Sequence, residues 1–374
     1  MDANSLFAAA SAFVGYTYVG YPLLMWALSR RRPAPTPAHP APWPEVTVVM
    51  AAHNEARKVA AKILNLRELD YPRDRLHIIV VSDGSTDDTV DVLRQEPGVF
   101  VIECIERAGK ANAINLGMQR VTTPLVMLCD VRQRIEPGAL KQLVSRVLEP
   151  GVGAASGELV HVDPATRVAA SIGLYWRYEK WIRHCESLVR STVGATGALY
   201  VMRRELFVPL DTGTLLDDLE IPMNIARQGQ RVVFEPSAIV SDELQADLAG
   251  ERGRKIRTLA GNYQSALRHP WMLLPFANPL WFQFISHKIF RLLVPYALLL
   301  ALGASLMSPN PWVQAAGGAQ AVFYCASVAA MIHAPLRRTR LLGFGAVFVD
   351  MNVSVVRALL VYLRGSTGSV WKKA

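Results

Sequence analysis

The stretch Leu76-His-Ile-Ile-Val-Val-Ser-Asp83-Gly-Ser-Thr-Asp-Asp88 indicates the fold class of this chain. It begins with an apolar, β-branched run that predicts a buried strand. The run ends at Asp83-Gly84, a pair typical of a tight turn, and Thr86-Asp-Asp88 then offers capping residues for a helix extending to about residue 94. A buried strand that turns directly into a helix is the repeating unit of an α/β sheet.

The same unit recurs on both sides of this stretch. Helical patterns separate the apolar runs, and the strands that these runs predict lie at residues 46–50, 99–102, 125–128 and 152–157. Alternation at this spacing predicts a doubly wound, mostly parallel sheet. The expected fold class is therefore α/β and Rossmann-like.

Acidic residues stand at several of the predicted strand ends. Asp83 ends the second strand, Asp130 follows the fourth, and the pair Asp217-Asp218 opens a later helical pattern. In an open α/β sheet the ligand binds outside the carboxyl ends of the strands. We therefore expect a ligand site at this edge of the sheet.

Hydrophobic segments flank this region. Residues 6–28 and 292–336 carry no Asp, Glu, Lys or Arg, and Ser308-Pro-Asn-Pro311 divides the second segment into two possible spans. Residues 341–363 contain Asp350, Asn352 and Arg357, so they could form a third span with a polar inner face or a helix in the membrane interface. Both alternatives remain open.

These patterns divide the chain into five parts. We expect an N-terminal transmembrane anchor at 1–30, a proline-rich linker at 31–45, a catalytic domain at 46–265, an interfacial segment at 266–290, and a transmembrane hairpin plus a third span or interfacial helix at 291–374. The acidic Asp2 before the first apolar run is unlike a secretory signal, which favours a retained anchor.

Basic residues indicate the orientation and account for the formal net charge of +9. Arg30-Arg-Arg32, His287-Lys288 and Arg337-Arg338 flank the apolar segments, which places the middle domain in the cytoplasm by the positive-inside rule. On this rule residues 308–310 lie outside, and the basic Trp371-Lys372-Lys373 end is expected inside. No nucleic-acid-binding module is recognisable. Four cysteines without a Cys-x-x-Cys pair indicate neither a disulfide framework nor a zinc site.

Several residues also have a structural interpretation. Asp83 could simply form an Asx turn, and Lys110 could be an ordinary exposed lysine at a helix start. Asp217 could cap its helix with Glu220 three residues later, which would leave Asp218 free to act as a base. The charges of the amphipathic helix at 175–188 are expected on a solvated or interdomain face.

The order of these motifs resembles the inverting GT-A glycosyltransferases of family 2. The likeness covers about residues 46–261, and the terminal helices resemble those of membrane-integrated members that make polysaccharides. The resemblance implies that His53, Glu55 and Asp83 hold the nucleoside of a nucleotide-sugar donor. It also implies that Lys110 and Asp130 contact the diphosphate, and that the acidic pair Asp217-Asp218 contains the general base, for which we favour Asp218.

The chain departs from the family pattern at two motifs. Arg132 stands where the second aspartate of Asp-x-Asp normally helps to bind Mg²⁺ or Mn²⁺, which leaves Asp130 as the single metal ligand of the motif. An arginine could neutralise a pyrophosphate directly. The Gln-x-x-Arg-Trp motif aligns with Arg254-Lys-Ile-Arg257-Thr258, so Arg254, Lys255 and Arg257 could grip a diphosphate, but the tryptophan of processive members is missing.

The expected function is inverting transfer of a sugar, from a UDP-sugar, to a glycan acceptor at the cytoplasmic face of the cell membrane. The setting would be envelope polysaccharide synthesis, with partner proteins of an export system. One alternative is a single-addition transferase acting on a lipid-linked sugar. An alternative of another class is a catalytically silent scaffold of a polysaccharide assembly.

Overall fold

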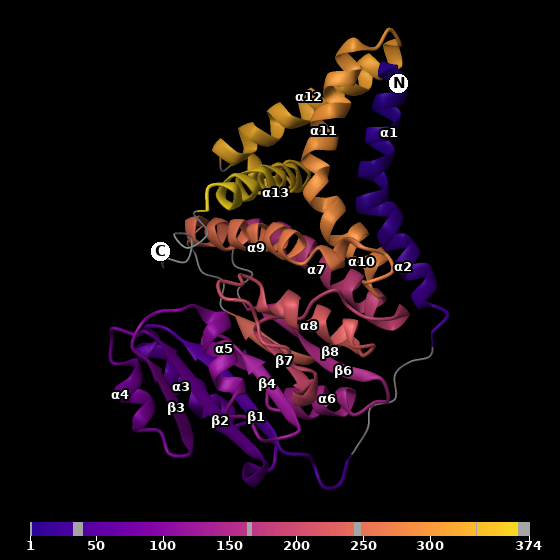
Figure 1. The fold of residues 1–374 in the computed structure, drawn as a ribbon. Coiled ribbons are helices and arrows are strands. Elements are labelled where there is room, and N and C mark those ends of the chain that lie inside the picture. The colour runs from indigo at the N-terminus through magenta and orange to yellow at the C-terminus, as the bar shows by residue number, and fades with distance from the viewer. Residues whose placement is uncertain (1, 33–39, 163–166, 243–247, 334, 366–374) are drawn as a thin grey trace.

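The computed structural model describes residues 2–32, 40–162, 167–242, 248–333 and 335–365. Residues 33–39 of the expected linker and the Trp371-Lys372-Lys373 segment lie outside these ranges. Figure 1 shows two layers: an α/β domain built around one sheet, and a group of long helices standing on one side of it. Both chain segments that flank the α/β domain contribute to the helical group.

The sheet is mixed, with strand order β3-β2-β1-β4-β7-β6-β8-β5. Its first half is parallel, as expected, whereas β7 runs antiparallel to both β4 and β6. The strands are β1 Val46–Ala52, β2 Leu76–Asp83, β3 Val99–Cys104, β4 Leu125–Cys129, β5 Arg134–Ile135, β6 Val152–His161, β7 Leu199–Arg203 and β8 Arg231–Asp242. The predicted α/β class is confirmed, and β5, β7 and β8 are additions to the predicted strands.

Helices cover both faces of the sheet, which explains why the central strands are apolar throughout. On one face Val48 and Met50 of β1 pack with Ile63 of the first covering helix, whereas Val49 points to the other face and packs with Ile114. The helices of the α/β domain are α3 Ala56–Arg67, α4 Thr89–Arg94, α5 Lys110–Met118, α6 Ala139–Val147, α7 Arg167–Val189, α8 Asp217–Arg227 and α9 Leu248–Arg268.

Three helices of the other layer are long and apolar enough to cross a membrane: Trp281–Met307, Pro311–Ile332 and Arg340–Leu363. The first combines α10 Trp281–Gln283, a π-helical segment Phe284–Ile289 and α11 Phe290–Met307, and the others are α12 and α13. The structure does not form the separate interfacial segment expected at 266–290. Helix α9 continues to Arg268, and the long apolar helix begins at Trp281, so these two helices contain both ends of the expected segment.

The N-terminal helix α1 Ala3–Gly15 lies beside α11, and α2 Tyr21–Ser29, which follows a π-helical segment Tyr16–Gly20, packs against α7. The rings of Phe13 and Phe290 contact in a tilted arrangement with their centroids 4.9 Å apart, and Ser308 donates a hydrogen bond to Asn4 at 2.5 Å. The two π-helical segments meet, since the Tyr16 hydroxyl and Ser286 Oγ lie 2.9 Å apart. The two ends of the chain's described part are thus packed into one helical group.

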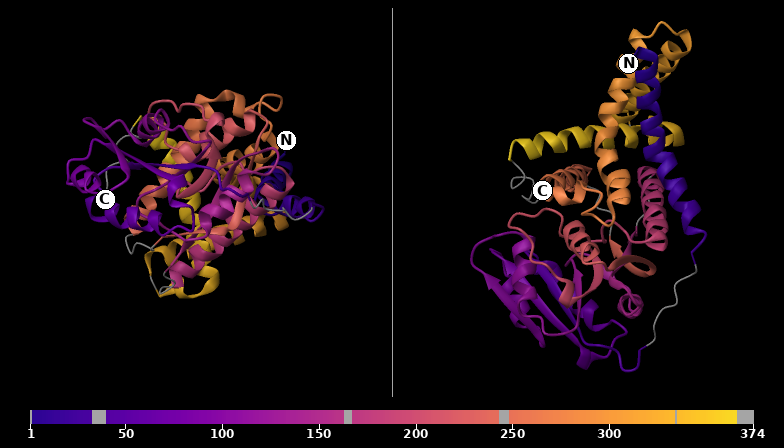
Figure 2. Two further views of the ribbon diagram at one scale, coloured as in Figure 1. Left: turned by 90° about the horizontal axis from the view of Figure 1, so that it is seen from below. Right: turned by 45° about the vertical axis from the view of Figure 1, so that its right-hand side comes forward.

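Helix α13 lies crosswise to α11 and against α9, as both views of the side of the molecule show (Figures 1 and 2). An ion pair joins these two helices, because Arg252 Nη2 lies 3.1 Å from Asp350 Oδ1. On other sides of α13, Leu341, Phe344 and Leu360 are exposed. The helix thus combines a charged contact with α9 and exposed apolar side chains.

Buried charges connect α7 to the helical group. His287 contacts the carboxylates of Glu186, at 2.8 Å, and Glu179, at 3.2 Å, and Arg291 also pairs with Glu179. The Arg291 guanidinium and the hydrogen bond from His287 outweigh the effect of burial and hold the pKa of Glu179 well below its usual range. The α7 charges therefore lie on an interdomain face, and the solvated alternative is wrong for Glu179 and Glu186.

Candidate functional site

The loop after β2 is organised by Asp83. Its buried carboxylate accepts hydrogen bonds from the backbone N–H groups of Ala108, at 2.7 Å, and Gly109, at 2.8 Å, just before α5 begins. Gly84 follows with φ +59°, and a Cβ atom there would lie 2.5 Å from the Arg107 nitrogen, so the close approach of the two loops requires glycine. Asp83 thus joins two loops instead of closing a simple Asx turn.

The residues after β1 pack against the same loop. His53 Nδ1 lies 2.7 Å from the backbone oxygen of Asp83, and Asn54, with φ 53°, accepts a hydrogen bond from the Thr86 N–H at 2.8 Å. Glu55 stands at the start of α3, where its N–H donates to Thr89 Oγ1 and its carboxylate lies 3.9 Å from Lys58. The structure therefore brings His53, Glu55 and Asp83 together at one end of the sheet.

Lys110 bridges two carboxylates at the centre of this edge. Its ammonium group lies 2.9 Å from Asp130 Oδ1 and 3.1 Å from Asp217 Oδ2. Burial alone would lower the pKa of Lys110, but the two carboxylates raise it above its ordinary value, so the lysine stays charged. Both structural interpretations made from the sequence, an exposed Lys110 and a capping Asp217, are therefore wrong.

The first turn of α8 shows why Asp217 is no cap. Leu216 occupies the N-cap position, no side chain there accepts a capping hydrogen bond, and Asp217 is already helical. The expected partner, Glu220, instead accepts hydrogen bonds from Thr214, at 3.1 Å, and Ser265, at 2.9 Å. Asp217 is left to pair with Lys110, and Asp218 projects to the other side of that turn.

Asp218 is held by a small-residue loop that precedes β7. The Ala195 N–H donates to the backbone oxygen of Asp218 at 2.8 Å, and a Cβ atom on Gly197 would lie 3.0 Å from Asp218 Oδ2. The sequence analysis missed this loop, although its Gly194-Ala-Thr-Gly197 pattern between a helix and a strand is a signal of close backbone approach. Burial first, and the Asp217 charge next, raise the pKa of Asp218 to about 6.

This pKa leads to a testable pH dependence. If Asp218 acts as a base, its carboxylate must be deprotonated, so we expect the transfer rate to fall about tenfold per pH unit below pH 6 and to level off above it. The folded-state pKa of Asp218 lies above the ordinary pKa of an aspartate. For this group alone, folding is therefore most favoured at low pH, and that stability is lost as the pH rises through about 6.

Transfer rates measured from about pH 3 to 8 at saturating donor would check this dependence, with unfolding followed at each pH. An acid limb with an apparent pKa near 4 would show that the carboxylate is not perturbed, or is not the base.

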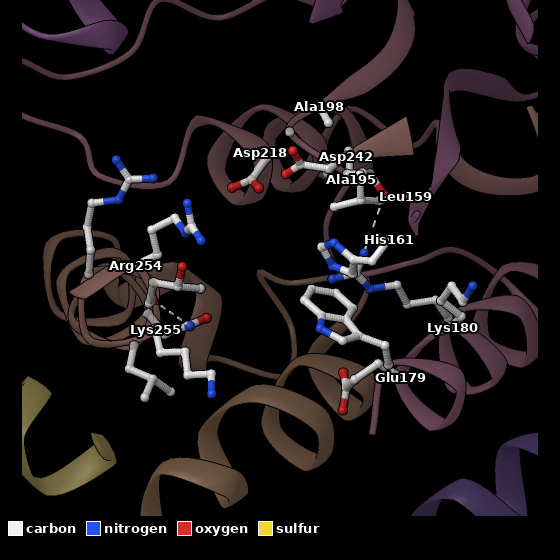
Figure 3. Close-up of a pocket in the computed structure, with 18 of the residues that line it drawn as sticks. Leu159, His161, Glu179, Lys180, Ala195, Ala198, Asp218, Asp242, Arg254 and Lys255 are labelled. Atoms are coloured by element: carbon white, nitrogen blue, oxygen red, sulfur yellow. Dashed lines mark hydrogen bonds between the residues drawn. The ribbon is translucent and has the colours of Figure 1, made fainter. Parts of the chain in front are cut away.

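A cavity of about 390 Å³ opens beside Asp218. Figure 3 shows the Asp218 and Asp242 carboxylates on one side of it, Arg254 and Lys255 on a second, and His161, Lys180 and Glu179 on a third. Of the residues predicted from the sequence, those lining it are Asp130, Arg132, Asp218, Arg254, Lys255 and Arg257. His53, Glu55 and Asp83 are not among the lining residues. Lys110 contacts the lining residue Asp130, and Asp217 in turn contacts Lys110.

Arg132 was expected to be available to neutralise a pyrophosphate, but the structure pairs it with a carboxylate. Its Nη2 atom lies 2.5 Å from Asp242 Oδ2, at the end of β8, and Gln133 donates to the same oxygen at 3.3 Å. Arg132 is therefore already paired with a carboxylate from another strand. The contact could not be foreseen because β8 was not predicted.

Comparison with known proteins identifies the domain. The model of the family described as glycosyl transferase family 2 matches residues 47–208. This region is a glycosyltransferase family 2 domain. The match ends just after β7, so Asp217, Asp218 and the cationic α9 lie beyond it in the chain.

Relatives of known name agree with this assignment. Over 271 residues the chain is 22% identical to the poly-beta-1,6-N-acetyl-D-glucosamine synthase of Staphylococcus aureus strain COL, covering 69% of this chain and 64% of that protein. It is also 26% identical over 221 residues to a Bacillus subtilis protein named "Probable glycosyltransferase YdaM", covering 54% and 51%. The chain thus spans less than two thirds of the length of these relatives.

A solved structure resembles nearly the whole chain. The mannosyltransferase PcManGT from Pyrobaculum calidifontis, in complex with GDP-Man and Mn²⁺, superposes with a TM-score of 0.71 at 26% identity, covering 99% of this chain and 100% of that one. The resemblance to family 2 and the GT-A-like fold are confirmed, and the family 2 domain supports glycosyltransferase activity.

Proposed function

We propose that the protein transfers a sugar with inversion, from a nucleotide sugar to a glycan acceptor at the cytoplasmic face of a membrane, in envelope polysaccharide synthesis. We expect a UDP-linked donor. The observation that carries the proposal is the position of Asp218, which lines a cavity rich in cations beside the strand ends where an α/β fold binds its ligand.

In the proposed reaction Asp218 accepts the proton of an acceptor hydroxyl. That oxygen attacks the anomeric carbon as the bond from this carbon to the donor diphosphate breaks, so the nucleoside diphosphate leaves with the bonding electrons and the configuration inverts. Arg254, Lys255 and Arg257 on α9 face the cavity and would hold the leaving diphosphate through charge-assisted hydrogen bonds. The nucleoside would lie towards His53, Glu55 and Asp83.

The residues present fit a divalent metal poorly. Asp130 is paired with Lys110, and Arg132 occupies the motif position where the family places its second ligand. Within the described part of the chain no three His, Cys, Asp or Glu side chains gather as metal ligands. PcManGT binds Mn²⁺, so we propose that this chain needs metal less than such a relative does, and we assign no step to the metal.

Substitutions at Arg132 test the metal proposal. Arg132→Asp would restore the Asp-x-Asp motif and place a second carboxylate near Asp242, so we expect activity that falls at least tenfold in chelator and recovers with Mn²⁺. Arg132→Ala is expected to depress activity at every metal concentration. Transfer is measured in chelator and across a Mn²⁺ titration.

Arg134→Asp, a change of equal charge at an exposed position, is the matched control. A wild-type enzyme that is inactive in chelator and saturates at micromolar Mn²⁺ would contradict the proposal.

Membrane association is supported by the three apolar helices, and the orientation remains our proposal. Basic residues at 30–32 and 337–340 place the α/β domain in the cytoplasm, with residues 308–310 on the other side of a cell membrane. The crosswise α13 favours the interfacial alternative for residues 341–363.

The decisive experiment incubates membranes that contain the full chain with a panel of radiolabelled sugar nucleotides, UDP- and GDP-linked, and sizes the labelled product. Product that depends on Asp218 supports the proposal, and its size separates polymer synthesis from single addition. Membranes in which no donor is transferred or hydrolysed would favour the catalytically silent scaffold.

A further inference from the structure

The cavity is lined by more cations than carboxylates. Among its lining residues that the structure describes, eight are Lys or Arg and four are Asp or Glu. Two of the lysines pair with carboxylates outside the lining: Lys180 with Glu158, and Lys255 with Asp350. Which cations can meet an anionic ligand therefore depends on the pairs that each one already makes.

Two of these cations form no direct ion pair. Arg132 pairs with Asp242, Lys180 with Glu158, and Arg291 with Glu179. Arg183 and Lys288 have no ion pair with any residue in the described ranges, and Arg183 makes a single long contact of 3.5 Å to Thr196 Oγ1. Both side chains are only partly buried, and an anionic ligand that contacts them would have no direct ion pair to displace.

Arg183 and Lys288 lie in the cavity between the proposed base, Asp218, and the helical group. Arg183 comes from α7, Lys288 comes from the π-helical segment at the foot of the long apolar helix, and both line the cavity that Asp218 lines. The charges of both act on the Asp218 carboxylate, where they oppose the rise in its pKa. Both cations thus lie close to the place where the acceptor must bind.

Apolar side chains line the same cavity. Leu292 belongs to α11, and Val347 and Met351 belong to α13, so helices long and apolar enough to cross a membrane contribute part of the wall. A ligand held there would meet cations beside the base and apolar side chains on the membrane helices. A phosphate joined to a long hydrocarbon chain has this combination of groups.

We propose that Arg183 and Lys288 bind the phosphate of a lipid-linked sugar, which is the acceptor. The inference rests on the proposed function and deepens it by naming the acceptor class. The sugar hydroxyl lies at Asp218, the phosphate lies at the two cations, and the hydrocarbon chain passes along α11 and α13 into the membrane. The α9 cations remain for the donor diphosphate.

Binding tests this without requiring turnover. The full chain is reconstituted in phosphatidylcholine nanodiscs, and the affinity for a polyprenyl phosphate is measured. The polyprenyl alcohol of equal length, inorganic phosphate, and phosphatidylglycerol serve as separate probes. We expect tight binding of the polyprenyl phosphate and at least tenfold weaker binding of each of the other three.

Variants then locate the site. Lys288→Gln and Arg183→Gln are each expected to weaken polyprenyl phosphate binding about 10–100-fold, the usual effect of losing a hydrogen bond to a charged group, while nucleotide affinity changes less than threefold. Lys288→Arg should retain most of the binding. Lys141→Gln, which removes one positive charge from an ion pair on α6 outside the cavity, is the matched control.

Three outcomes would overturn the inference. Nucleotide affinity that falls while lipid affinity is unchanged would assign the two cations to the donor. Equal binding of the alcohol would exclude a phosphate contact, and equal binding of inorganic phosphate would exclude a lipid acceptor. Failure of the proposed function is distinguishable, because it would appear as absence of nucleotide binding and transfer in the wild-type chain.

Discussion

Replacing Asp218 with Asn is expected to lower sugar transfer by about 10²–10⁴-fold, the usual contribution of a general base. The amide keeps the shape of the side chain between Gly197 and the cavity but cannot accept the proton of the acceptor hydroxyl. Nucleotide affinity should stay within about threefold, because the base acts on the acceptor and Asp218 is not part of the Lys110 bridge. Transfer of labelled sugar and equilibrium binding of the nucleoside diphosphate measure the two effects.

The neighbouring aspartate provides the comparison for this variant. Asp217→Asn removes an equal charge one residue away. Its main effect should be on stability, through the loss of the contact with Lys110, and it should also move the acid limb to lower pH because the Asp217 charge helps to raise the pKa of Asp218. If Asp218→Asn abolishes nucleotide binding together with transfer, the residue is a donor ligand and another group must be the base.

Replacing Lys110 with Met is expected to lower the free energy of unfolding by about 3 kcal/mol. Removing one member of a buried ion pair leaves an uncompensated charge that costs about 3–5 kcal/mol, and the partial exposure of Asp130 places this case at the low end. The loss of the positive charge also raises the pKa of Asp218 further, because Lys110 is the first of the cations that lower it. Denaturation of the full chain in detergent, followed by circular dichroism, gives the stability.

Two variants control for the loss of a lysine. Lys58→Met removes an exposed lysine 3.9 Å from Glu55 and should change stability by less than about 0.5 kcal/mol. Lys110→Arg keeps the charge and should recover part of the loss. A Lys110→Met chain of wild-type stability that no longer binds nucleotide would show instead that Lys110 is a donor ligand, the role implied by the family resemblance.

The parallel half of the fold could be predicted because each of its strands is a local apolar run. Strands β1, β2, β3 and β4 are read directly from residues 46–50, 76–81, 99–102 and 125–128. Strand β8 contains Glu235-Pro236-Ser237, where its register with β6 shifts, and a proline within a run argues against a strand. The antiparallel direction of β7 depends on its pairing with β4 and β6, and the local sequence of a strand does not indicate its direction in the sheet.

The site shows the same division between local and distant information. The sequence order of Asp83, Asp130 and Asp218 predicts an acidic edge, since each follows a recognisable element. Partners distant in the chain were invisible: Lys110 with Asp217, Arg132 with Asp242, and Glu186 with His287. These pairs decide which charged side chains a ligand can contact. The cations available at the site therefore could not be identified without the tertiary structure.

The crosswise α13 has a practical consequence for preparing the enzyme. This helix forms part of the cavity wall through Val347 and Met351, is attached to α9 by the Asp350–Arg252 pair, and has exposed apolar side chains. Solubilising agents act on those exposed side chains, whereas His53, Glu55 and Asp83, the residues that we propose bind the nucleoside, lie at the edge of the sheet. We therefore expect harsh micelles to yield preparations that still retain nucleotide but fail to turn over, and activity to return when native-like bilayer is restored around α13.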